Sequence, residues 1–113
     1  MHELSIVMSI IDIATQQATN ANATLVDEIE LDVGALSGIE MNAFDFAWKQ
    51  AVEDSILQNA TLTINRIEGK AICIDCSASF EIQQYFDACP VCGEHLINII
   101  QGKELKVKSL VVS

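Results

Sequence analysis

Apolar residues recur at helical spacing near the start of the chain and predict a helix over residues 4–18. The main apolar stripe of this helix contains Leu4, Val7, Met8, Ile11, Ala14 and Ala18. The stripe is widened by Ile6, Ile10 and Ile13, which indicates a helix buried on more than one side. We therefore interpret Met8 as an ordinary core residue.

Residues 24–33 alternate between apolar and acidic positions, which is typical of a strand with one buried face. The inward positions are Ile29, Leu31 and Val33. The outward positions are Glu28, Glu30 and Asp32, and we interpret this acidic row as a solvated face.

A loop with two glycines, residues 34–38, leads from this strand into a second predicted helix over residues 42–57. Asn42 is a suitable N-cap, with Asp45 three residues later. The predicted packed stripe contains Phe44, Ala47, Trp48, Ala51, Val52, Ser55 and Ile56.

Three further strands are predicted, over residues 61–72, 96–100 and 105–112. The chain leaves the second strand and returns to the last one around an inserted module, so we expect these two strands to be near neighbours. On the last strand, Lys106 and Lys108 should lie across from acidic residues such as Glu28, Glu30 or Glu68. The pattern predicts an α+β fold of two helices packed on a small three-stranded sheet.

The chain has 113 residues, the length of about one domain, and a formal net charge of −10. Its only basic cluster is Lys103, Lys106 and Lys108, whereas a nucleic-acid-binding protein needs a basic face. Nucleic acid is therefore not expected as a partner. An acidic surface suits solubility, cation handling and basic protein partners.

The start of the chain does not resemble a secretory signal, because the first basic residue is Lys49 and Asp12 interrupts the apolar region. No apolar run reaches the length of a membrane span. We therefore expect a cytoplasmic protein without a membrane partner.

All four cysteines lie in two Cys-x-x-Cys pairs separated by twelve residues: Cys73, Cys76, Cys89 and Cys92. Two residues between thiolates let both sulfurs of one tight turn face the same ion, and two such turns complete a tetrahedral site. Pro90 and Gly93 supply the turn chemistry of the second pair. The spacing predicts a structural zinc site in a zinc-ribbon-like module.

Other uses of the four cysteines remain open at this stage. Two structural disulfides would suit a secreted protein, and a Cys-x-x-Cys pair can be a redox motif. Iron in a rubredoxin-like site uses the same tetrahedral sulfur ligands, although Ser77 stands where the first turn of such a site would have glycine.

A second possible metal site lies at the N-terminus. The α-amine of Met1, the amide nitrogen of His2 and the His2 Nδ1 can close two adjacent chelate rings, and nitrogen donors in a plane favour Cu(II) or Ni(II). The first N–H groups of a helix have no intrahelical acceptor, so an amide here can lose its proton to a metal. A Met-His start can also arise by chance.

Four segments taken together resemble the HypA/HybF family of hydrogenase maturation factors, which are nickel metallochaperones. These are Met-His-Glu-Leu-Ser at residues 1–5, Val-Gly-Ala-Leu-Ser-Gly-Ile-Glu at 33–40, the two cysteine pairs, and Gln-Gly-Lys-Glu-Leu at 101–105. The resemblance covers the whole chain. It implies a small mixed sheet and a protein that binds Ni(II) for transport and Zn(II) for structure.

The resemblance further implies two domains, a nickel-binding α+β domain (residues 1–70 and 101–113) and an inserted zinc-binding domain (71–100). His2 would be the required nickel ligand, and the further candidates at that site are Met1, Glu3 and Glu40. The implied partners are a HypB-type GTPase and the large subunit of [NiFe]-hydrogenase, with urease maturation proteins as further candidates.

No nucleophile–base pair stands out in the sequence, so we expect a metal carrier and not an enzyme. His95, three residues after Cys92, is interpreted as an exposed loop residue. Two other functions remain as alternatives: a zinc-ribbon adaptor that binds proteins, and a rubredoxin-like electron carrier.

Overall fold

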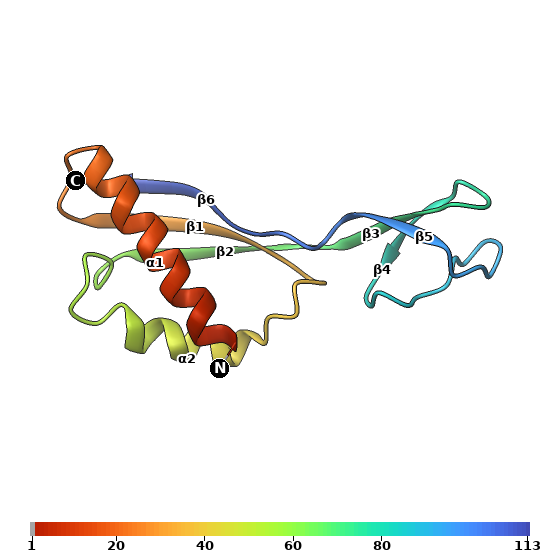
Figure 1. Cartoon of the computed structure of the whole chain (residues 1–113), viewed down its shortest axis with the longest axis horizontal. Helices are drawn as coiled ribbons and strands as arrows, with labels where there is room; N and C mark the ends of the chain where they lie inside the picture. The colour runs from red at the N-terminus through yellow and green to blue at the C-terminus, as the bar shows by residue number, and fades with distance from the viewer. Residues whose placement is uncertain (1) are drawn as a thin grey trace. The chain divides into compact units, whose positions relative to one another are not determined.

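The computed structural model describes residues 2–113, with side chains from Glu3 onward. The elements, in chain order, are α1 (His2–Asn20), β1 (Val26–Gly34), α2 (Met41–Ala51), β2 (Thr61–Ile67), β3 (Gly69–Cys73), β4 (Ser79–Ile82), β5 (Ile97–Gln101) and β6 (Leu105–Val112) (Figure 1). Among the described residues, no helix is both long enough and apolar enough to cross a membrane.

The chain forms two compact units. Unit 1 contains the described residues through Leu31 together with Ile39–Asn65 and Lys106–Ser113. Unit 2 contains Asp32–Gly38 and Arg66–Leu105. Each unit therefore draws on segments that are far apart in the sequence.

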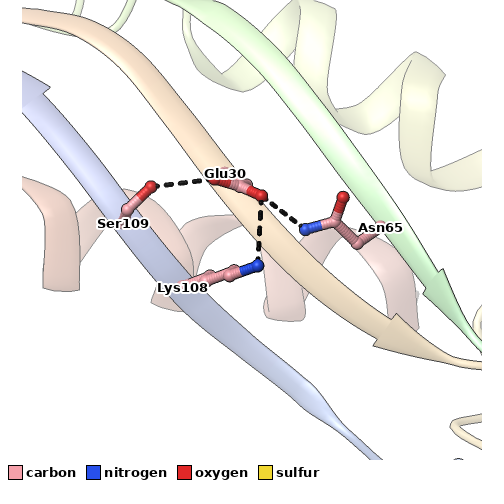
Figure 2. A network of polar contacts seen from close by, with 4 residues as sticks. All are labelled: Glu30, Asn65, Lys108 and Ser109. Atoms are coloured by element: carbon pink, nitrogen blue, oxygen red, sulfur yellow. Dashed lines mark hydrogen bonds and ion pairs between the residues drawn. The ribbon is translucent and has the colours of Figure 1, made fainter.

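Unit 1 is built on a three-stranded sheet with the order β2-β1-β6. β1 and β2 run in the same direction and β6 runs opposite, so the sheet is mixed, as expected (Figure 2). The strands β2 and β6, which we expected to be near neighbours, lie close in the sheet but are not paired, because β1 lies between them.

One face of α1 packs in the core of unit 1, through Val7, Ile10, Ile11, Ala14 and Ala18. These buried residues span an arc of only about 100° around the helix. Met8 and Ile13 lie outside this arc on opposite sides and are 47% and 49% exposed, and Leu4 is 39% exposed. The predictions of a core Met8 and of burial on more than one side were therefore wrong, although Ile10 is buried as expected.

The second helix is shorter than predicted and ends at Ala51, six residues before the expected end. The chain continues from Val52 through a series of turns. Asp54 has a positive φ of 62°, and the Ser55 hydroxyl donates to the Val52 carbonyl and accepts from the Leu57 N–H. Short polar side chains compete in this way with helical hydrogen bonding. Val52 and Leu57 nevertheless remain in the core.

The face of the unit 1 sheet away from the helices carries a polar network around Glu30 (Figure 2). Its carboxylate accepts from Asn65 Nδ2 at 2.6 Å and from the Ser109 hydroxyl at 3.1 Å, and Lys108 Nζ lies 3.6 Å away. The expected pairing of Lys108 with an acidic residue is confirmed. These contacts lower the pKa of Glu30 below its usual value, although partial burial opposes them. The hydrogen bond from Asn65 has the largest effect, followed by those of Ser109 and Lys108.

Unit 2 has its own sheet, with the order β4-β3-β5 and antiparallel pairing on both sides of β3. The single strand predicted over residues 61–72 is in fact two strands, β2 and β3, which belong to different sheets. β4, between the cysteine pairs, was not predicted. The core of unit 2 contains Leu36, Ala71 and Ile82, with Phe80, Ile97 and Ile99 packed against them.

Three glycines allow backbones to cross closely in unit 2. A Cβ on Gly34 would collide with the carbonyl of Gly102, and a Cβ on Gly102 would lie 2.6 Å from the Cα of Gly69. Gly102 also has a φ of 114°, which residues other than glycine rarely adopt. Beyond this crossing, the N–H groups of Ala35 and Leu36 donate to the carbonyls of Ile67 and Gly102.

Candidate metal sites

The four cysteines come together in unit 2, with all four Sγ atoms within 4.8 Å of one another. The Sγ atoms of Cys73 and Cys92 lie 3.5 Å apart, and those of Cys76 and Cys89 lie 3.6 Å apart. Zn–S bonds of about 2.3 Å give a regular tetrahedron with edges of about 3.8 Å, so the cluster matches the size that Zn²⁺ requires. All four are free thiols, and the disulfide alternative was wrong.

The two cysteine turns have the same local geometry. In the first turn, the Ser77 N–H donates to the Cys73 carbonyl at 2.9 Å, and in the second, the Gly93 N–H donates to the Cys89 carbonyl at 2.8 Å. Both donors have positive φ, 64° for Ser77 and 79° for Gly93. Ser77 therefore adopts the conformation expected of glycine, in spite of its side chain.

The first cysteine of each turn is buried and the second is exposed. Cys73 ends β3 and is 1% exposed, and Cys89 is 2% exposed, whereas Cys76 and Cys92 face outward. The sulfur cluster thus joins the core of unit 2 to its surface. A metal bound by all four sulfurs would tie both turns to β3.

The backbone of the second turn favours ionised sulfur at Cys89. The N–H groups of Cys92 and Val91 donate to this sulfur and lower its pKa to about 7. The Glu94 N–H likewise lowers the pKa of Cys92, but the neighbouring Cys73 thiol and the desolvation of the Cys92 sulfur outweigh it and raise that pKa to about 12. A divalent cation would hold all four cysteines as thiolates, so the donor set fits zinc.

Comparison with known proteins places the whole length of the chain in one protein family. The model of a family described as "Hydrogenase/urease nickel incorporation, metallochaperone, hypA" matches residues 1–112. The chain is 44% identical over 112 residues to the hydrogenase maturation factor HypA of Parabacteroides distasonis, covering 99% of this chain and 97% of that protein. The chain belongs to the HypA family.

Other HypA proteins agree in sequence and in fold. HypA of Legionella pneumophila (strain Corby) is 42% identical, with 99% of both chains covered. The solution structure of the Ni metallochaperone HypA from Helicobacter pylori superposes with a TM-score of 0.69 at 26% identity, covering 97% of this chain and 96% of that one. A second HypA solution structure gives a TM-score of 0.72 at 27% identity, covering 100% and 97%.

The predicted N-terminal nickel site of this HypA-family chain is described only in part. Met1 and the side chain of His2 lie outside the described residues, so their roles stay a prediction. The carboxylate of Glu3 is described, and its Oε2 lies 3.4 Å from the Glu40 backbone N–H, which donates to it. The start of α1 therefore lies beside the start of α2.

Glu40 has a structural role that the sequence did not reveal. Its carboxylate caps α2, with one oxygen accepting from the Asn42 N–H at 3.2 Å and the other from the Ala43 N–H at 2.6 Å. The predicted cap, Asn42, lies inside the helix instead. The usual preference for Ser, Thr, Asp or Asn at an N-cap pointed to the wrong residue.

His95 is exposed and does not belong to the metal-ligating cluster. Within the described residues, the cluster of metal-ligating side chains contains the four cysteines only. This agrees with the interpretation of His95 as a surface residue of the loop before β5.

Proposed function

We propose that this protein binds Ni(II) at its N-terminus and delivers it during maturation of [NiFe]-hydrogenase. The observation that carries the proposal is the hydrogen bond from the Glu40 N–H to Glu3, which brings the α2 start next to the residue that follows His2. Full-length similarity to HypA supports the choice of nickel as cargo.

The proposed ligands are the Met1 α-amine, the His2 amide nitrogen and the His2 Nδ1. A planar set of nitrogen donors favours Ni(II) over metals that prefer tetrahedral sites. The N-termini of two helices oppose a nearby cation by about 0.3–1 kcal/mol each, and the carboxylates of Glu3 and Glu40 offset this. A site at a chain end can open readily, which suits a carrier that must release its metal.

Glu40 acts in this proposal as a positioning residue. While both of its carboxylate oxygens accept helix N–H bonds, it holds the α2 start in the conformation that lets its own N–H reach Glu3. Glu3 thus supplies negative charge next to the proposed nickel ligands, and Glu40 fixes the backbone at the start of α2.

We further propose that the four-cysteine site holds zinc for structure. The functional division into a nickel-binding domain (1–70 and 101–113) and a zinc-binding domain (71–100) is retained as part of the proposal. Unit 2, which holds the sulfur cluster, extends on both sides of that zinc-binding domain.

The proposed partners are a HypB-type GTPase and the [NiFe]-hydrogenase large subunit, with urease maturation proteins as further candidates. The protein would act in the cytoplasm as a carrier and not as an enzyme. Family membership supports a place in hydrogenase maturation, and these individual partners follow from the resemblance alone.

Nickel titration of the tagless, zinc-loaded protein tests the proposal. His2→Ala should lower nickel affinity at least 100-fold and leave zinc at one per chain, because no other described side chain can replace Nδ1 in the same chelate ring. His95→Ala is the matched control and should bind nickel as the wild type does. Tight nickel binding retained in His2→Ala would place the site elsewhere.

A second form of the protein isolates the terminal amine. One glycine added before Met1 converts the α-amine into an amide while every side chain remains. Nickel affinity should fall strongly, and it should also fall with acid in the wild type, because protons compete for the amine and imidazole. Equal affinity of the extended and native proteins would rule out the amine as a ligand.

Metal analysis and colour separate the alternatives. A zinc-ribbon adaptor would bind one zinc and no nickel. A rubredoxin-like carrier would be red when its four thiolates hold ferric iron, whereas the zinc protein is colourless.

A further inference from the structure

The two cysteine turns expose apolar side chains on the outside of the sulfur cluster. Ile74 is 62% exposed, Val91 74% and Leu96 62%. Ile74 directly follows Cys73 and Val91 directly precedes Cys92, and the Sγ atoms of these two cysteines are 3.5 Å apart. The Ile74 N–H donates to the Leu96 carbonyl at 2.9 Å, so all three side chains belong to one end of unit 2.

Carboxylates are interleaved with these apolar residues. Asp75 follows Ile74, and Glu94 lies between Val91 and Leu96. Neither carboxylate forms an ion pair or a side-chain hydrogen bond with any described residue, in contrast to Asp87, which accepts from the Gln83 and Gln84 N–H groups. We call Ile74, Asp75, Val91, Glu94 and Leu96 the knuckle surface.

The segment of the chain that carries the knuckle surface holds charges of one sign, and the basic residues of unit 2 (Arg66, Lys70 and Lys103) lie outside this segment. Residues 71–102 contain four acidic residues and no lysine or arginine. Four thiolates with one Zn²⁺ add further negative charge at the centre. An exposed apolar patch interleaved with carboxylates is typical of an interaction site, and a basic partner complements its charge.

We propose that the knuckle surface binds a basic amphipathic segment of a partner protein. Apolar side chains of that segment pack on Ile74, Val91 and Leu96, and its lysines or arginines pair with Asp75 and Glu94. This surface lies in unit 2 and uses none of the proposed nickel ligands, so it goes beyond the nickel proposal and can fail or succeed without it.

The test measures binding of a fluorescent 14-residue peptide, with leucines on one helical face and lysines on the other, to the zinc-loaded full chain without nickel. Val91→Ser/Leu96→Ser should weaken binding at least tenfold, and Asp75→Asn/Glu94→Gln at least threefold. Matched changes in unit 1, Phe46→Ser and Asp45→Asn/Glu53→Gln, should stay within twofold of the wild type. A peptide with glutamate in place of lysine should not bind.

Zinc content of each variant is measured alongside, and Ile74→Ser replaces the double apolar variant if that variant holds less than one zinc per chain. An equal loss of peptide affinity in Asp75→Asn/Glu94→Gln and in Asp45→Asn/Glu53→Gln would show general attraction of a cationic peptide to an acidic protein. That result would overturn the proposal. Unchanged affinity in the apolar variant, or equal binding of the glutamate peptide, would overturn it as well.

Discussion

Single carboxylates hold much of the backbone and strand geometry in this acidic protein. Glu40 caps α2, the Asp87 carboxylate accepts from two N–H groups of its own turn, and Glu104 accepts from the Gly102 N–H at 2.6 Å. Glu30 joins β1 to β2 and β6 through Asn65, Ser109 and Lys108. These acidic side chains therefore also order the fold.

Glu30→Gln should destabilise unit 1 at neutral pH, and the loss should vanish in acid. The folded state lowers the pKa of Glu30, so its ionised form contributes stability above the unfolded value of about 4.5, and this contribution disappears as the pH falls through the folded value. Thermal unfolding of wild type and variant at pH 7 and at pH 3.5 measures the difference. A difference that stayed constant between the two pH values would show that the charge is not involved.

The helix α2 depends on one side chain at its N-terminal end, the carboxylate of Glu40. Glu40→Ala leaves two helix N–H groups without a partner and should cost about 0.5–2 kcal/mol of stability. Glu40→Ser keeps a capping oxygen without the charge and should recover most of the loss. Chemical denaturation of the two variants, compared with the wild type, provides the measurement.

The same pair of variants separates capping from nickel ligation. If Glu40 acts only as the cap, Glu40→Ser should bind nickel within about threefold of the wild type. A large loss of nickel affinity in Glu40→Ser with normal stability would make the carboxylate a ligand.

Elements with strong local periodicity could be predicted from the sequence. The positions of α1, β1 and β6 follow from the apolar pattern, and the spacing of the cysteines alone predicted the sulfur cluster. The division between β2 and β3 could not be predicted, because it depends on the close approach of Gly69 and Gly102, which are far apart in the chain. The capping role of Glu40 was missed because glutamate is an uncommon N-cap.

Across the whole molecule, the zinc site should control the order of unit 2 while the helices of unit 1 remain. Cys76→Ser removes one ligand from a site whose metal binding contributes on the order of 10 kcal/mol to folding. Zinc should be lost, and amide hydrogen exchange should accelerate across β3, β4 and β5 while α1 and α2 stay protected.

His95→Ala is the matched control for that experiment, since it changes an exposed residue beside the site, and it should retain zinc and protection. Zinc retained at one per chain in Cys76→Ser, with unchanged exchange in β3, would show that the cysteines do not hold the fold of unit 2.

The interleaving of the two units along the chain sets the order of events during translation. Unit 2 needs Asp32–Gly38 together with Arg66–Leu105, and unit 1 still lacks its edge strand β6 until Leu105–Val112 have been made. Neither unit can be completed by an emerging N-terminal fragment. Capture of zinc by all four cysteines is therefore a late event, since it must wait until both cysteine pairs have been synthesised and have emerged from the ribosome.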